Sequence, residues 1–147
     1  MQPLVKVKLL DKEAKIPTYA TDGDAGADIY SLEDITLWSG ERKLVRTGIA
    51  IELPKGYEAQ IRPRSGLALK NGVTVLNTPG TIDQLYRGEV KVILYNTGST
   101  DAPSVDLPAG SKIAQMVIKP VEQAIFSEAK RLSSTSRGEN GFGSTGK

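Results

Sequence analysis

Short runs of alternating apolar and polar residues recur along most of the chain, and such runs predict β-strands. Valine and lysine alternate over Val5–Leu10, and apolar residues alternate again over Val90–Tyr95. Gly, Pro, Asn and Asp cluster between the runs, as is typical of the turns that join short strands. The pattern predicts strands over residues 5–10, 27–31, 35–37, 44–53, 57–61, 73–76, 90–95, 105–107, 110–118 and 125–132.

One stretch departs from the strand pattern. Residues 67–70 are good helix formers that follow Ser65, so a helix of one or two turns is expected with Ser65 near its N-terminus. Gly40 and Gly48 interrupt the strand pattern and are expected to mark breaks or bulges. About ten short strands with one short helix predict an all-β fold, a jelly-roll-like barrel or sandwich.

The C-terminal residues have a different composition, rich in Gly, Ser and Thr. Such a segment cannot bury a core, so we expect one β domain over residues 1–132 and a flexible arm over residues 133–147. Within the arm, Arg137 suits a phosphate group, Phe142 suits a flat ring, and the backbone amides of residues 141–145 suit an anion. A tail that only aids solubility has a similar composition.

Length and charge bound the general class of the protein. The chain has 147 residues, enough for one domain with its own core, and its 19 Lys and Arg nearly balance 17 Asp and Glu. This balance argues against nucleic-acid binding through a broad basic face. Residues 1–10 lack the apolar core of a signal peptide, and no run approaches membrane-spanning length, so we expect a cytoplasmic protein without a membrane segment.

The absence of two residue types limits the catalytic and metal sites that the chain can form. The chain has no Cys, which excludes disulfides, zinc-thiolate sites and a thiol nucleophile. It has no His, which excludes a Ser-His-Asp triad and an imidazole base. Acid–base work in an enzyme of this composition falls to a carboxylate, Tyr or Lys, and a bound metal has oxygen ligands, which suits Mg²⁺.

The stretch over residues 75–89 lies between two predicted strands and is rich in turn residues, so it predicts a β-hairpin with a wide, structured tip. The tip carries an amide, Asn77, a carboxylate, Asp83, and an aromatic ring, Tyr86. Ile82 precedes Asp83 and is expected to hold the carboxylate against apolar surface, an environment that suits a general base. An ordinary hairpin with a surface Asp is the alternative.

Three further side chains are candidates for a site. Asp28 follows a turn rich in Asp and Gly and either faces a metal with its water shell or is simply solvated. Arg64 stands beside the predicted helix N-terminus, where it binds a phosphate or lies on the surface. Gln115 lies in the middle of a strongly apolar strand and faces either a site or backbone partners.

Five stretches, taken together, resemble the trimeric dUTP diphosphatase (dUTPase) family. They occur in the family's order, span most of the chain, and are Asp24–Ile29, Pro63–Ala68, Asn77–Gly88, Gly110–Gln115 and Arg137–Gly146. The resemblance implies Mg²⁺-dependent hydrolysis of dUTP to dUMP and pyrophosphate, which keeps uracil out of DNA and supplies dUMP for thymidylate synthesis. It also implies a homotrimer in which three subunits share each active site.

The resemblance also implies residue roles. By position in the motifs, Asp83 activates the water that attacks the α-phosphorus, and Asp28 holds Mg²⁺ through its water shell. The phosphates are gripped by four residues: Arg64, Ser65, Gly66 and Gln115. The uracil edge is read by Asn77, by the backbone of Thr81, Ile82 and Asp83, and by Lys91.

The remaining roles concern the sugar and the arm. Tyr86 packs against the deoxyribose and leaves no room for a 2′-hydroxyl. Arg137 meets the γ-phosphate and Phe142 covers the uracil, with the neighbouring arm residues Gly143 and Ser144 also in contact with the substrate.

Two positions depart from the family's pattern. Leu85 stands where many members have an acidic residue, and Ser111–Lys112 stand where many have Asp-Arg or Glu-Arg, which puts a structural ion pair in doubt. Two alternatives stay open, a dCTP deaminase relative of the same superfamily and a catalytically idle copy of the fold used as a binding module. The glycine-rich tail and the intact Asp83 favour pyrophosphate release over both.

Overall fold

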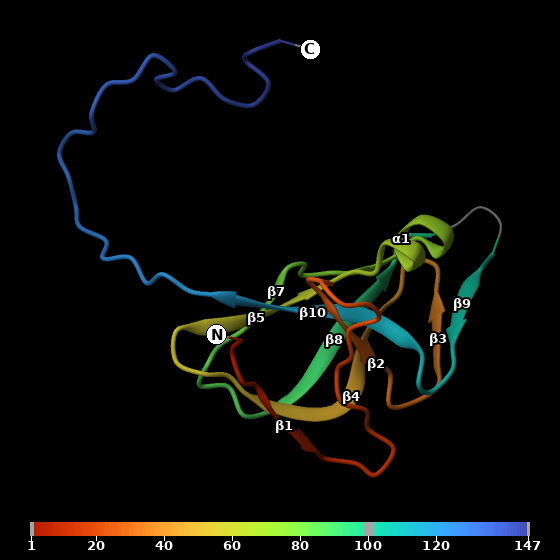
Figure 1. Cartoon of the computed structure of the whole chain (residues 1–147). Helices are drawn as coiled ribbons and strands as arrows, with labels where there is room; N and C mark the ends of the chain where they lie inside the picture. Colours follow the sequence, from red (N-terminus) through yellow and green to blue (C-terminus); the bar gives the residue numbers. More distant parts are fainter. Residues whose placement is uncertain (1, 99–101, 147) are drawn as a thin grey trace.

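Two four-stranded antiparallel sheets and a two-stranded ribbon surround one apolar core in the computed structural model, which describes residues 2–98 and 102–146 (Figure 1). The strand order is β1-β4-β8-β6 in one sheet, β2-β10-β5-β7 in the other and β3-β9 in the ribbon. The elements are β1 (Lys6–Leu9), β2 (Ala27–Tyr30), β3 (Ile35–Trp38), β4 (Arg42–Glu52), β5 (Tyr57–Arg62), α1 (Ser65–Asn71), β6 (Val73–Val75), β7 (Gly80–Ile82), β8 (Glu89–Asn96), β9 (Ser104–Leu107) and β10 (Lys112–Pro120). The all-β, jelly-roll-like fold expected from the sequence is therefore confirmed.

The alternating pattern decides which side chains face the core. In β8, Val90, Val92 and Leu94 are buried while Lys91 between them is exposed. Successive side chains of a strand point to opposite faces, so an apolar residue at every second position covers one face of the sheet. The largest fully buried apolar side chains are Ile29, Leu37, Val45, Ile49, Val73, Val75, Val90, Val92, Leu94 and Ile113.

Gly48 marks the bulge that the sequence predicts in β4. The pairing of β4 with β8 shifts register between Arg46 and Ala50, and Gly48 has a φ of +71°. A Cβ atom at Gly48 would lie 2.8 Å from the Cβ of Ala14, so a side chain there is excluded by space as well as by backbone conformation. Gly40, the other expected break, lies in the turn between β3 and β4.

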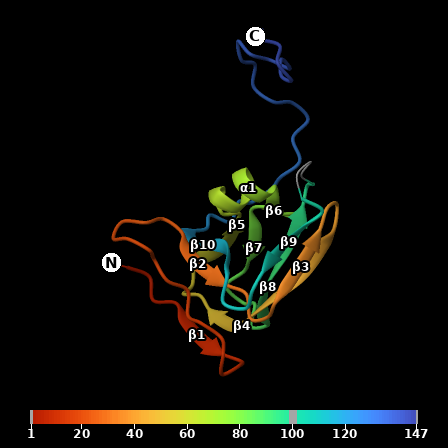
Figure 2. The same cartoon turned by 90° about the vertical axis from the view of Figure 1, so that its right-hand side faces the viewer.

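The predicted short helix is present as α1, with Ser65 as its first helical residue. It ends where Gly72 adopts a left-handed conformation, with φ 64°, and the Gly72 amide donates to the carbonyl of Ala68. Figure 2 shows α1 at one end of the two sheets. Within the described residues, no helix is long and apolar enough to cross a membrane.

The predicted hairpin is more elaborate than expected. Its two arms pair as β6 and β8, but its tip contains a further strand, β7, which pairs with β5 in the other sheet. Ile82 of β7 is buried in the core, and this burial holds the tip across both sheets. The sequence predicts a wide, structured tip but not this strand, because three residues are too few to show a period-two pattern.

The expectation of a strand over residues 125–132 is wrong. The last strand, β10, ends at Pro120, and residues 121–140 are exposed without helix or strand structure. A strand requires a neighbouring edge that accepts its hydrogen bonds, and this segment runs away from the body of the subunit (Figure 1). The division into a domain over residues 1–132 and an arm over residues 133–147 stays a prediction.

Candidate functional site

A pocket of about 400 Å³ opens between the hairpin tip and strand β8. Its lining brings together six of the residues predicted to form the site: Asn77, Thr81, Ile82, Asp83, Tyr86 and Lys91. Leu44, Val90 and Ile93 add apolar surface to the same lining. A pocket with apolar walls and a few convergent polar groups is typical of a small-molecule site. We call it the hairpin pocket.

Asp83 stands at this pocket in an environment that differs from the expected one. Ile82 is buried, but Asp83 is exposed within one subunit, so the apolar contact expected around the carboxylate is not present. The residue follows the last position of β7, where the chain turns and the Asp83 carbonyl accepts the Tyr86 amide at 3.1 Å. The alternation that buries Ile82 therefore leaves Asp83 pointing away from the core.

The loop that carries Asp83 and Tyr86 is closed by its own hydrogen bonds. The Tyr86 hydroxyl donates to the Glu89 carbonyl at 2.9 Å, and the Arg87 guanidinium donates to the carbonyls of Gln84 and Tyr86 at 2.7 and 3.1 Å. These bonds lie within residues 83–89, and the Gly56 amide adds a bond from outside the loop by donating to the Gln84 side chain at 2.8 Å. The ring of Tyr86 is thereby held on the wall of the hairpin pocket.

Glu89 anchors the end of that loop, and sequence reasoning missed it. Its carboxylate is largely buried and accepts bonds from the Gly48 amide at 2.9 Å and from Arg46 Nε at 3.1 Å. The Glu89 side chain thus ties the start of β8 to the bulge of β4. An acidic residue directly after Gly88 was the available signal, but its partner at the bulge is distant in sequence.

Asp28, on strand β2, is the centre of a second group of side chains. Its carboxylate is almost fully buried, with Arg64 Nε at 3.2 Å from one oxygen and Lys112 Nζ at 2.8 Å from the other. Gln115 is the residue that pairs with Asp28 across β10 and β2. We call Asp28, Arg64, Lys112 and Gln115 the Asp28 cluster. Lys112 was known from the sequence only as a departure from the family pattern, and here it makes an ion pair with Asp28.

The charges around Asp28 set its protonation state. Burial raises the pKa of the Asp28 carboxyl, but the hydrogen bond from Lys112 and the charges of Arg64 and Lys112 outweigh burial and hold the pKa below its usual value. One carboxylate with two cations leaves the cluster with net positive charge. Since Ser65 and Gly66 begin the helix next to Arg64, this end of the sheet suits an anion such as a phosphate.

The side chains around Asp28 also show how the expected Mg²⁺ ion could bind there. Across residues 2–98 and 102–146, no group of three or more Asp and Glu side chains lies close enough to hold a metal ion directly. Both oxygens of Asp28 already have cationic partners. Mg²⁺ in nucleotide enzymes usually keeps several waters and uses one or two carboxylates together with substrate phosphates. The cluster therefore fits a hydrated ion that arrives with phosphates, and not a metal held by side chains alone.

The lowered pKa of Asp28 leads to a prediction about acid stability. The folded pKa lies below the ordinary value of 3.8, so the ionised carboxylate stabilises the fold above that value and loses this effect as the pH falls through the folded pKa. Asp28→Asn should lower the melting temperature at neutral pH, with a difference from the wild type that narrows in acid. A difference of equal size at both pH values, measured by thermal melting, would contradict this account.

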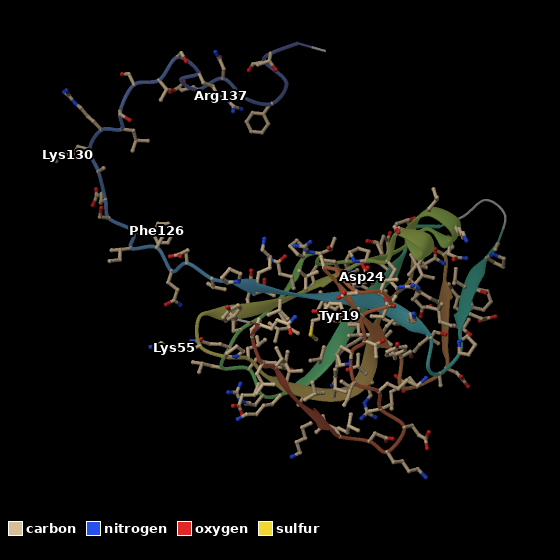
Figure 3. The ribbon with its side chains drawn as sticks, in the orientation of Figure 1. Tyr19, Asp24, Lys55, Phe126, Lys130 and Arg137 are labelled. Carbon is tan, nitrogen blue, oxygen red and sulfur yellow. The ribbon has the colours of Figure 1, made fainter. Side chains whose placement is uncertain are left out.

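The arm residues are separate from both groups in this structure. Arg137 and Phe142 are exposed, and Arg137 Nε donates only to the nearby Asn140 carbonyl at 2.9 Å among the described residues. Figure 3 shows Arg137, with Lys130 and Phe126, along the extended tail and away from the sheets. One subunit therefore presents the predicted site as three parts: the hairpin pocket, the Asp28 cluster and the arm.

Comparisons with known proteins identify the family of this chain. The family model described as dUTPase matches residues 12–146. A deoxyuridine 5'-triphosphate nucleotidohydrolase from Clostridium tetani is 58% identical over 143 residues, covering 97% of each chain.

Solved structures extend the comparison to the fold. A variant of the Staphylococcus bacteriophage 80alpha dUTPase with dUpNHpp has a TM-score of 0.89 at 28% identity and covers 97% of this chain and 98% of that chain. A dUTPase variant from phage phi11 of S. aureus, whose structure is described as revealing how a structural Mg(II) ion is coordinated, has a TM-score of 0.79 at 25% identity and covers 87% of this chain and 97% of that chain. The chain therefore belongs to the dUTPase family of enzymes.

Proposed function

We propose that the protein hydrolyses dUTP to dUMP and pyrophosphate with Mg²⁺, and that each active site combines the hairpin pocket, the Asp28 cluster and the arm. The observation that carries the proposal is the hairpin pocket, where a carboxylate, an aromatic ring and an amide converge on one cavity. The named activity of the C. tetani relative and the dUpNHpp in the 80alpha structure support it.

The uracil ring is the part of the substrate that suits the hairpin pocket. A uracil edge presents carbonyl acceptors on either side of one N–H donor, so it needs both donors and acceptors from the protein. The Asn77 amide supplies both, and the backbone around Thr81 supplies more. Lys91 on the same lining lies 4.0 Å from a carboxylate oxygen of Glu89, which keeps its ammonium group at the pocket wall.

The triphosphate is the part that suits the Asp28 cluster. Arg64 and Lys112 supply positive charge, and Asp28 orients both cations. Gln115 and the backbone at Ser65 and Gly66 supply neutral donors. Bound Mg²⁺ would neutralise the phosphates and orient them, with Asp28 holding the ion through water.

Asp83 is the proposed general base. It accepts a proton from the water that attacks the α-phosphorus, since a carboxylate is the strongest candidate base in a chain without His. Its exposure within one subunit is consistent with a site that closes only when the arm and the nucleotide cover it. Closure would exclude bulk water and hold the attacking water in line.

Tyr86→Ala should relax the selection against ribonucleotides. The Tyr86 ring lies on the pocket wall, where it is proposed to exclude bulk at the 2′ carbon of the sugar. Steric rejection of this kind is worth on the order of 1–3 kcal/mol, so the dUTP/UTP ratio of kcat/KM should fall by about 10- to 200-fold. An unchanged ratio would remove Tyr86 from this role.

The homotrimer is proposed because one subunit leaves apolar surface uncovered. Ile125, Phe126 and Leu132 in the tail are 97%, 94% and 89% exposed, and Figure 3 shows Phe126 beyond the edge of the body. The body in turn has an open groove of about 670 Å³ whose apolar lining includes Val5, Val7, Ile16, Tyr19, Met116 and Ile118. Association that covers both surfaces would also bring the arm of one subunit to the site of another.

We expect the protein to sediment as a trimer at micromolar concentration. Phe126→Ser should weaken the trimer, because it removes a large apolar side chain from the proposed contact. Leu69→Ser, which changes an exposed apolar residue on α1, outside the tail and the groove, is the matched control. A fully active monomer in sedimentation velocity would contradict the proposal.

A nucleotide panel tests the proposed activity against its alternatives. With Mg²⁺ present, pyrophosphate should be released rapidly from dUTP and slowly from UTP, dCTP and dTTP. Ammonia released from dCTP would indicate a deaminase. No turnover of any of the four nucleotides would indicate a binding module.

A further inference from the structure

Gly88 has ordinary backbone conformation but no room for a side chain. It is not among the glycines with positive φ, so its backbone conformation is open to other residues. A Cβ atom at this position would lie 2.6 Å from Cζ and 2.9 Å from Cε2 of Tyr86, and closer still to the Tyr86 hydroxyl oxygen. The ring of Tyr86 therefore occupies the space that a side chain at position 88 would need.

We propose that Gly88 is a positioning residue for sugar selection, because its missing side chain lets the hydroxyl end of the Tyr86 ring lie close to the loop backbone. The ring position then sets how closely Tyr86 approaches the 2′ carbon of a bound nucleotide. This inference rests on the proposed function, in which Tyr86 discriminates dUTP from UTP.

The Tyr86 ring is held from two sides in this arrangement. The Gly88 backbone supports it, and the hydroxyl donates to the Glu89 carbonyl at 2.9 Å. Glu89 is itself fixed, because its carboxylate accepts the Gly48 amide and Arg46 Nε. The ring is thus connected through Glu89 to the bulge of β4, by contacts that all lie within one subunit.

A side chain at position 88 should move the ring and leave the fold intact. Tyr86 is 46% exposed, so its ring can turn outward about its own side-chain bonds into solvent. The three nearest atoms all belong to the far end of the Tyr86 side chain. Gly88→Ala therefore changes the position of the Tyr86 ring, whereas Tyr86→Ala removes the ring.

Two other glycines provide a comparison within the same chain. Gly26 and Gly80 also have ordinary backbone conformation, and Cβ atoms there would lie 3.1 Å from Gln115 and 3.3 Å from Asn77, respectively. Those contacts are tight, but they can be relieved by shifts of a few tenths of an ångström. The contact at Gly88 is much closer, so Gly88 should have the largest effect on a substrate-reading side chain.

The test is a double-mutant cycle read as the dUTP/UTP ratio of kcat/KM. Gly88→Ala should lower the ratio at least tenfold, within the range of about 10- to 200-fold set by steric rejection in a packed site. Tyr86→Ala should lower it as far or further. Adding Gly88→Ala to Tyr86→Ala should then change the ratio no further, because the ring through which Gly88 acts is already absent.

Several outcomes would overturn the inference. They are an unchanged ratio in Gly88→Ala, an additive effect of Gly88→Ala in the Tyr86→Ala background, and a Gly88→Ala chain that fails to fold while the double variant folds. Tyr86→Phe should lower the ratio less than Gly88→Ala, because it keeps the backbone support and removes only the bond to Glu89. If the wild type releases no pyrophosphate from dUTP, the proposed function fails instead, so the two failures are distinguishable.

Discussion

Asp83→Asn is expected to keep the fold and nucleotide binding while lowering kcat by about 10²–10⁴-fold, the usual effect of losing a general base. The amide has the shape of the carboxylate but cannot accept the proton of the attacking water. Asp83 is exposed and lies outside the core, so the substitution should leave the melting temperature unchanged. The measurement is kcat for dUTP together with the dissociation constant of a non-hydrolysable analogue such as dUpNHpp.

A matched substitution separates this role from a general effect of charge. Asp106→Asn removes an exposed carboxylate that accepts a bond from the Thr36 hydroxyl on the β3-β9 ribbon, outside the lining of the hairpin pocket. It should leave kcat within a small factor of the wild type. Near-normal turnover in Asp83→Asn would show that another group activates the water.

Deleting residues 137–147 is expected to lower kcat strongly and to leave the fold, the proposed trimer and much of the dUMP affinity intact. The arm is exposed in the unliganded subunit, and ordering roughly ten of its residues costs about 10–20 kcal/mol of backbone entropy. Contacts of Arg137 and Phe142 with the nucleotide must offset this, so closure should require all three phosphates. A product without the pyrophosphate then releases the arm and leaves the site.

Single substitutions in the arm test its two proposed contacts. Arg137→Ala should weaken dUTP binding more than dUMP binding, because only the triphosphate carries the γ-phosphate. Phe142→Ala should also weaken dUTP binding, because Phe142 is proposed to cover the uracil when the arm is closed, and it should change dUMP binding little, because dUMP lacks the phosphates that close the arm. If the truncated protein turns over dUTP at the full-length rate, with the same melting temperature, the arm has no part in catalysis.

Local patterns in the sequence predicted the fold well where short-range chemistry decides it. Alternation located most strands, Gly48 marked the bulge in β4, and the turn residues of the tip placed Asn77 and Asp83 on one pocket. Strand β7 was missed because its three residues are defined by pairing with β5, a contact that no local pattern records.

The partners of the site residues were harder to predict for the same reason. Lys112 meets Asp28, and Glu89 meets Gly48, across strand pairs that join distant parts of the chain. Two further predictions were wrong for a different reason: the strand at residues 125–132 and the apolar surroundings of Asp83. In the proposed trimer, the surfaces that would contact these residues come from a neighbouring subunit or from the closed arm.

Hydrolysis of dUTP in ¹⁸O-labelled water, with Mg²⁺ and the full chain, tests the central claim most directly. Attack of water on the α-phosphorus places the new oxygen in dUMP, so dUMP should carry the label and pyrophosphate should be unlabelled, in equal amounts. Label in pyrophosphate, release of dUDP with inorganic phosphate, or no turnover of dUTP would contradict the claim.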